Sequence, residues 1–217
     1  MMLSATAAQA QLIDFFTTNG GFTNQNLVGN NPWTWTAGTG WRVNGAVSDD
    51  GVRSRLLSPV LTATGGAFGV VASHRFNFEQ SLGGGCFDGG AVFASINGGA
   101  FTQLTPSSGV GYTAAVSGNF GNPLGGLQAF CGTSAGWATP AFITSTISGT
   151  LTAGTTVRLA FDGGWDDSFT NPNPNWNLRS LDLRGFGPAV VIPEPSTYAL
   201  LATGLLALGL VARRRRV

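Results

Sequence analysis

The acidic residues of this chain gather in two Asp-Gly-Gly stretches, which have the chemistry to bind a hard cation. Asp88 begins one stretch, with Glu79 upstream, and Asp162 begins the other, with Asp166 and Asp167 just after it. Calcium takes about six to eight oxygen ligands in a tolerant geometry, and aspartates beside glycines can offer both carboxylate and backbone oxygens. Neither stretch has the spacing of an EF-hand or of a calcium-binding nonapeptide repeat. The alternative is that these aspartates cap tight turns.

Hydrolytic chemistry finds little support in the sequence. His74 is the only histidine, it lies in a segment expected to be a strand, and no Gly-x-Ser-x-Gly motif is present. We therefore expect a structural histidine and no enzymatic activity. A glycosidase that works with two carboxylates stays open as an alternative, because the sequence does not give the distance between them.

Six tryptophans have two possible roles, in the core or on a binding surface. Aromatic rings can present a flat apolar surface to a sugar, but the core of a β-sandwich also takes up tryptophan. Trp165 and Trp176 lie in segments rich in Asn, Asp and Pro, which are typical of loops. These two rings are therefore the predicted ligand contacts.

The segments that must position these residues alternate between apolar and polar residues and are separated by Gly, Asn, Asp and Pro. This pattern is typical of strands and turns. Asn97-Gly98-Gly99 predicts a hairpin, because these residues tolerate a positive φ. We expect an all-β domain at residues 11–188, a single antiparallel β-sandwich of the jelly-roll type. The clearest predicted strands lie in residues 66–78, 90–104, 141–149 and 155–164.

Charge and cysteine content narrow the function further. The net charge is +1, but without Arg213, Arg214, Arg215 and Arg216 seven basic residues face ten acidic ones, which argues against nucleic acid as a partner. Cys86 and Cys131 have no Cys or His at the spacing of a zinc site. In an exported protein this pair predicts a disulfide; two buried free thiols are the alternative.

Both ends of the chain have features of targeting segments. Ala8-Gln9-Ala10 fits the small-x-small pattern of signal peptidase sites, so we interpret residues 1–10 as the remnant of a signal peptide; an ordinary tail is the alternative. Residues 197–212 contain only Thr, Tyr, Ala, Leu, Gly and Val, and four arginines follow. This pattern predicts a single hydrophobic transmembrane helix whose arginine end stays in the cytoplasm and whose preceding domain lies outside.

The terminal sequence PEPSTYALLATGLLALGLVARRRR resembles the PEP-CTERM sorting signal of Gram-negative bacteria. The resemblance covers residues 189–217 and implies an exosortase as partner, with the inner membrane as a transient station before the cell surface or the extracellular space. It also implies that Arg213 to Arg216 act as a stop signal. A plain membrane anchor is the alternative. The implied recognition residues are Pro193, Glu194 and Pro195.

Residues 50–185 are similar to jelly-roll modules appended to secreted bacterial peptidases, which are distantly related to MAM domains. The segments that carry the similarity include SHRFNFE, FDGGAVFASINGGAFTQL and NWNLRSLDLRG. Such modules often hold a structural calcium between their sheets. The resemblance thus implies calcium as a cofactor, with Glu79, Asp88 and Asp182 as the preferred ligands.

Two functions remain. The first is a non-catalytic, exosortase-processed protein of the cell surface or extracellular matrix. The second is a carbohydrate-binding module, or less readily a glycan hydrolase, that acts on exopolysaccharide.

Overall fold

The computed structural model describes residues 10–45, 51–166 and 174–187, and every regular element in these ranges is a β-strand. No helix in these ranges is long and apolar enough to cross a membrane. The predicted transmembrane helix at 197–212, the sorting residues and residues 1–9 lie outside the described residues.

The strands form two main sheets in which every pairing of named strands is antiparallel. The sheet that we call the β7–β16 sheet has the order β10 (Ser108–Gly109), β14 (Ile143–Leu151), β7 (Gly66–Phe78), β16 (Pro174–Arg184), β4 (Gly40–Asn44) and β3 (Thr34–Thr36), with β1 (Gln11–Asp14) also beside β16 and β13 (Gly132–Thr133) also beside β7. The other, the β8–β15 sheet, has the order β2 (Thr23–Val28), β5 (Val52–Leu57), β15 (Thr156–Trp165), β8 (Gly89–Ile96) and β9 (Thr102–Leu104), with β6 (Leu61–Thr62) also beside β15. β11 (Ala114–Ala115) and β12 (Gln128–Ala129) form a separate pair.

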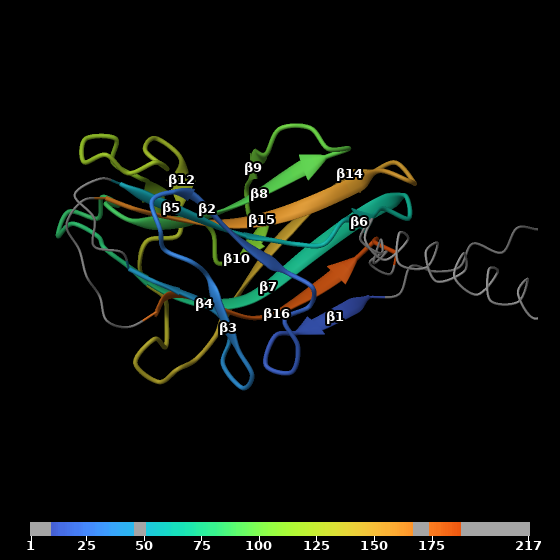
Figure 1. Cartoon of the computed structure of the whole chain (residues 1–217), viewed down its shortest axis with the longest axis horizontal. Helices are drawn as coiled ribbons and strands as arrows, with labels where there is room; N and C mark the ends of the chain where they lie inside the picture. Colours follow the sequence, from blue (N-terminus) through green and yellow to red (C-terminus); the bar gives the residue numbers. More distant parts are fainter. Residues whose placement is uncertain (1–9, 46–50, 167–173, 188–217) are drawn as a thin grey trace, which may run out of the picture.

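The longer strands alternate between the two sheets as the chain proceeds. β4, β7, β14 and β16 belong to one sheet, whereas β5, β8 and β15 belong to the other. This alternation is typical of a jelly roll. In Figure 1, β1, β3, β4 and β16 lie in the lower half of the view and β2, β5, β8 and β15 lie in the upper half. The predicted antiparallel β-sandwich is confirmed.

The core lies between the sheets and consists of the inward side chains of both. In β7, every second residue from Val70 to Phe78 is buried, as expected for a strand with one face toward the core. Phe161 of β15 and Trp176 of β16 meet across the core, with ring centroids 5.9 Å apart. A bulge in β16 between Leu178 and Ser180 changes the alternation, and Arg179 is its extra residue.

Local sequence patterns anticipated several elements correctly. β7 has the predicted bounds, and the hairpin between β8 and β9 turns at Asn97 and Gly98, whose φ angles are 50° and 73°. The strands β14 and β15 coincide with the predicted segments to within two residues at each end.

Candidate functional site

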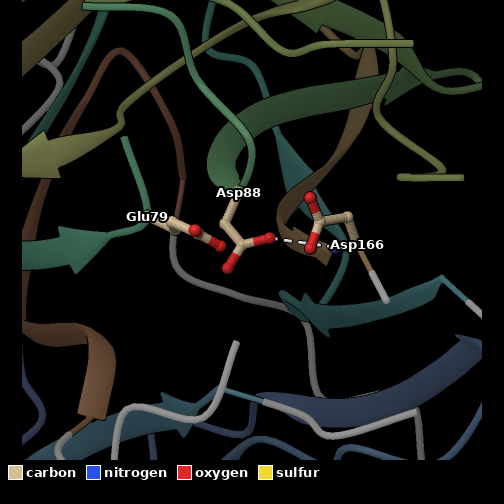
Figure 2. Close-up of side chains that lie close together, drawn as sticks. All are labelled: Glu79, Asp88 and Asp166. Carbon is tan, nitrogen blue, oxygen red and sulfur yellow. Dashed lines mark hydrogen bonds between the residues drawn. The ribbon is translucent and has the colours of Figure 1, made fainter. Parts of the chain in front are cut away.

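Three carboxylates from separate parts of the chain converge at one end of the sandwich. Glu79 follows β7, Asp88 precedes β8 and Asp166 follows β15. One carboxylate oxygen of each lies within 4.8 Å of the others, and Figure 2 shows the three side chains pointing toward one another. We call Glu79, Asp88 and Asp166 the carboxylate cluster.

Backbone hydrogen bonds and a disulfide fix this arrangement. The amide of Asp88 donates to the carbonyl of Glu79 at 3.4 Å, and the amide of Asp166 donates to Oδ1 of Asp88 at 2.9 Å. Cys86 and Cys131 form a disulfide, which confirms that prediction. Cys86 lies just before Asp88, and Cys131 lies just before β13, which pairs with the end of β7. The crosslink therefore holds the segment that carries Asp88 against the strand that leads to Glu79.

Asp88 is buried and strongly perturbed. It is 1% exposed, and its Oδ2 has no hydrogen-bond partner within the described residues. The pKa of Asp88 is raised to about 8, first because burial disfavours the charged form, and also because the carboxylates of Asp166 and Glu79 lie nearby; the hydrogen bond from the Asp166 amide acts in the opposite direction. A cation bound to the cluster would reverse this shift.

The burial of the cluster fits cation binding better than reaction with a sugar. Asp88 and Asp166 are both buried, so their carboxylates do not reach a polysaccharide chain on the surface. A pocket of about 410 Å³ lies beside Glu79, Gln80 and Thr133 and reaches the surface there. Glu79 is the member of the cluster that lines this pocket, so a sugar ring placed there would not contact Asp88 or Asp166.

Asp182, the third ligand implied by the sequence resemblance, lies elsewhere. It is in β16, paired in register with Val71 of β7, and its Oδ2 accepts hydrogen bonds from Arg184 at 2.6 and 3.0 Å. Eight residues of extended strand, about 26 Å at 3.3 Å per residue, separate that register position from Glu79. The structure therefore brings Glu79 and Asp88 together with Asp166 in place of Asp182.

Asp162, the first acid of the second Asp-Gly-Gly stretch, is part of a buried ion-pair network. It lies within β15, next to β5, and its side chain is fully buried. Arg55 binds both of its oxygens, at 2.7 and 2.8 Å, and Arg53 binds Oδ2 at 2.9 and 2.6 Å. This carboxylate is already compensated and offers nothing to a metal ion.

The prediction that Trp165 and Trp176 contact a ligand is wrong. Both rings are 0% exposed. Trp165 ends β15, where its Nε1 donates to Asn175, and Trp176 lies in β16 beneath Gly90 of β8. The polar residues around them indicated loops, but the strands extend into these segments and turn both rings into the core.

His74 and Ser145 form a hydrogen bond of 2.8 Å that resembles a catalytic pair in distance only. Trp176 Nε1 donates to Nδ1 of His74, so Nε2 carries the proton and donates to Ser145, whose hydroxyl in turn donates to the carbonyl of Val110. His74 is 1% exposed, and burial lowers its pKa to about 3. An imidazole in this state cannot accept the proton of Ser145, so the pair is structural.

Comparisons with known proteins identify the end of the chain. Residues 191–216 match the family model of the PEP-CTERM protein-sorting motif, so that resemblance is confirmed, and the chain carries the sorting signal of an exported protein. No curated protein matches the sequence.

Several solved structures resemble the chain at low sequence identity. One is the CBM22-1 xylan-binding domain of Xyn10C from Paenibacillus barcinonensis. Its alignment covers 86% of this chain and 100% of that domain's chain, with 9% sequence identity and a TM-score of 0.44. Another is the C-terminal CBM6 of LamC from Zobellia galactanivorans. Its alignment covers 81% of this chain and 99% of that module's chain, with 14% sequence identity and a TM-score of 0.35. These TM-scores are below 0.5, and they assign no ligand to this chain. The resemblance to peptidase-appended modules stays a prediction.

Proposed function

We propose that this chain is a non-catalytic protein of the cell surface or extracellular matrix, released from the inner membrane by an exosortase. The observation that carries the proposal is the sorting motif at residues 191–216. The disulfide between Cys86 and Cys131 supports it, because disulfides persist in oxidising compartments outside the cytoplasm. The buried, neutral His74 supports the non-catalytic part of the proposal.

Mass spectrometry of the C-terminus tests the sorting step. In a host with an exosortase, we expect the chain in the extracellular or surface fraction to end near Pro193 and to lack the four arginines. Replacement of Pro193 and Glu194 by alanine should leave the full-length chain in the membrane fraction, whereas Asp182→Asn in the sandwich should be processed normally. A secreted chain that retains Arg213 to Arg216 would contradict processing.

We propose in addition that the carboxylate cluster binds calcium and that this ion has a structural role. Asp88 supports this proposal most directly, because its buried Oδ2 has no hydrogen-bond donor within the described residues and two further carboxylates lie within 4.8 Å. Three carboxylates provide the hard oxygen ligands that calcium prefers, and the remaining ligands can be backbone oxygens or water.

Isothermal titration calorimetry with calcium chloride tests this second proposal. We expect one site per chain in the wild-type protein and at least a tenfold weaker affinity in Asp88→Asn. Asp182→Asn is the matched control, since it removes an aspartate outside the cluster and should bind calcium as the wild type does. No measurable heat in the wild type after exhaustive chelation would refute the calcium site.

A further inference from the structure

Three arginines, Arg42, Arg75 and Arg179, lie together on the outer face of the β7–β16 sheet. They border a groove of about 330 Å³, a size at the lower end of small-molecule sites. We call this feature the arginine groove. Its lining includes Phe16, Arg42, Arg75, Phe142, Asn177 and Arg179.

The sheet register explains why the arginines gather here. Asn177 of β16 pairs with Arg42 of β4 on one side and with Arg75 of β7 on the other. These three residues therefore form one row across adjacent strands. Arg179 is the extra residue of the β16 bulge, and bulges commonly redirect a side chain beside a functional site. The Asn177 amide donates to the carbonyls of Thr39 and Trp41, which fixes the row against the turn between β3 and β4.

Aromatic rings hold two of the guanidinium groups in place. The Cζ of Arg75 lies 4.8 Å from the ring centroid of Trp137 and 5.4 Å from that of Phe142. The Cζ of Arg179 lies 4.6 Å from the ring centroid of Phe16 and 5.8 Å from that of Phe142. Stacking of this kind occupies the flat face of a guanidinium and leaves its N–H groups, which lie in the plane, for an acceptor.

No acid in the described part of the chain compensates these charges. The ion pairs found there involve Arg53, Arg55 and Arg184, and no carboxylate lines the groove. The Nε of Arg75 is buried and has no hydrogen-bond partner among the described residues. Burial also lowers the pKa of Arg75. An unpaired buried donor costs free energy, and the Arg75 guanidinium is not fully satisfied by the described residues.

We propose that the arginine groove binds the carboxylate of an acidic saccharide, such as a uronic acid unit of an extracellular polysaccharide. The planar guanidinium fork matches a carboxylate with two parallel hydrogen bonds. The volume suits one or two sugar rings rather than a protein surface. The choice of an extracellular saccharide rests on the proposed export; the affinity of the groove for a carboxylate does not.

Binding to defined saccharides tests the proposal on the purified full chain. Titration with oligogalacturonate should show saturable binding, and a neutral dextran oligosaccharide of similar length should show none. Raising the salt concentration from 50 to about 500 mM should weaken the interaction, because the contact is between charges. Sulfated and phosphorylated oligosaccharides of equal length distinguish a carboxylate site from a general anion site: comparable binding of all three would overturn the assignment to carboxylate.

Substitutions locate the site. Arg179→Gln and Arg75→Gln should each weaken oligogalacturonate binding at least tenfold, and Arg75→Lys should restore only part of it because the fork is lost. Arg184→Gln is the matched control, since it removes an exposed arginine outside the groove. If Arg75→Gln fails to fold, Arg179→Gln at the exposed bulge still decides the question. Unchanged binding in Arg179→Gln, or equal binding of dextran, would overturn the proposal, and neither result bears on C-terminal processing.

Discussion

The same tripeptide, Asp-Gly-Gly, occurs in two neighbouring strands with opposite electrostatic outcomes. β8 and β15 run antiparallel so that Gly90 pairs with Gly163 and Gly89 with Gly164; Asp162 therefore lies within the ladder opposite Ala91, whereas Asp88 lies just beyond its end. Asp162 points toward Arg53 and Arg55 and is fully compensated, whereas Asp88 points toward two further acids. The cross-strand neighbours, and not the motif, decide whether a buried aspartate becomes part of an ion pair or a candidate metal ligand.

Removing the charge of Asp162 should produce the largest effect on stability. Asp162→Asn leaves two arginines largely buried without a counter-ion, and the loss of one partner from a buried ion pair costs about 3–5 kcal/mol. Urea unfolding should show this loss. Asp182→Asn breaks only a partly exposed pair and should cost less than about 1 kcal/mol. Equal losses in the two variants would mean that the Asp162 network contributes little.

Removing the disulfide should destabilise the fold and loosen the segment that carries Asp88. Replacing Cys86 and Cys131 by alanine opens a loop of 45 residues and should cost about 2–4 kcal/mol by the chain-entropy account. Since Cys86 lies two positions before Asp88, calcium affinity should fall as well. Alkylation with and without reductant checks the bond itself: wild-type chain that takes up two alkyl groups without reductant would contradict it.

The glycines of the two stretches can be tested through their contacts with tryptophan. A Cβ at Gly90 would lie 2.6 Å from the ring of Trp176, so Gly90→Ala should cost about 1–3 kcal/mol through overpacking. Gly118→Ala is the control, since a Cβ there meets nothing within 4 Å and its backbone does not have a positive φ. Thermal unfolding that leaves Gly90→Ala at the wild-type midpoint would show that the ring can move aside.

The smallest expected effect is a pH dependence of the unfolding free energy that comes from Asp88. Without a bound cation, Asp88 keeps its proton in the folded chain up to about pH 8, whereas its unfolded form loses the proton near 3.8. The folded state therefore binds more protons between these values, and the free energy of unfolding should fall as the pH rises from about 4 to about 8. Asp88→Asn should flatten this slope in calcium-free buffer. A slope unchanged in Asp88→Asn would assign it to other groups.

Sequence reasoning succeeded where the signal is local. Alternation over residues 66–78 and the Asn97-Gly98 turn define β7 and the β8–β9 hairpin without knowledge of the rest of the fold. The metal ligands were only partly predictable, because Asp166 meets Glu79 and Asp88 through sheet order, which no local pattern contains. The acid itself was visible in the sequence, directly after the second Asp-Gly-Gly stretch.

The tryptophans and arginines show the limits of composition. Polar neighbours suggested that Trp165 and Trp176 lie in loops, but Gly163 and Gly90 leave space for these rings beneath the strands. The arginine groove had no sequence signal, because Arg42, Arg75 and Arg179 are far apart in the chain and meet through the register of β4, β16 and β7. A bulge in β16 adds Arg179, and a single sequence does not reveal that bulge.

Asp88, unlike Asp162, has no arginine partner among the described residues, and we propose that calcium takes this place. The most direct test is the unfolding free energy at pH 8, measured in urea with and without calcium. We predict that calcium raises the stability of the wild-type chain and of Asp162→Asn by a similar amount, and that it leaves Asp88→Asn unchanged. A wild-type chain equally stable in calcium and in chelator would contradict the contrast between the two aspartates.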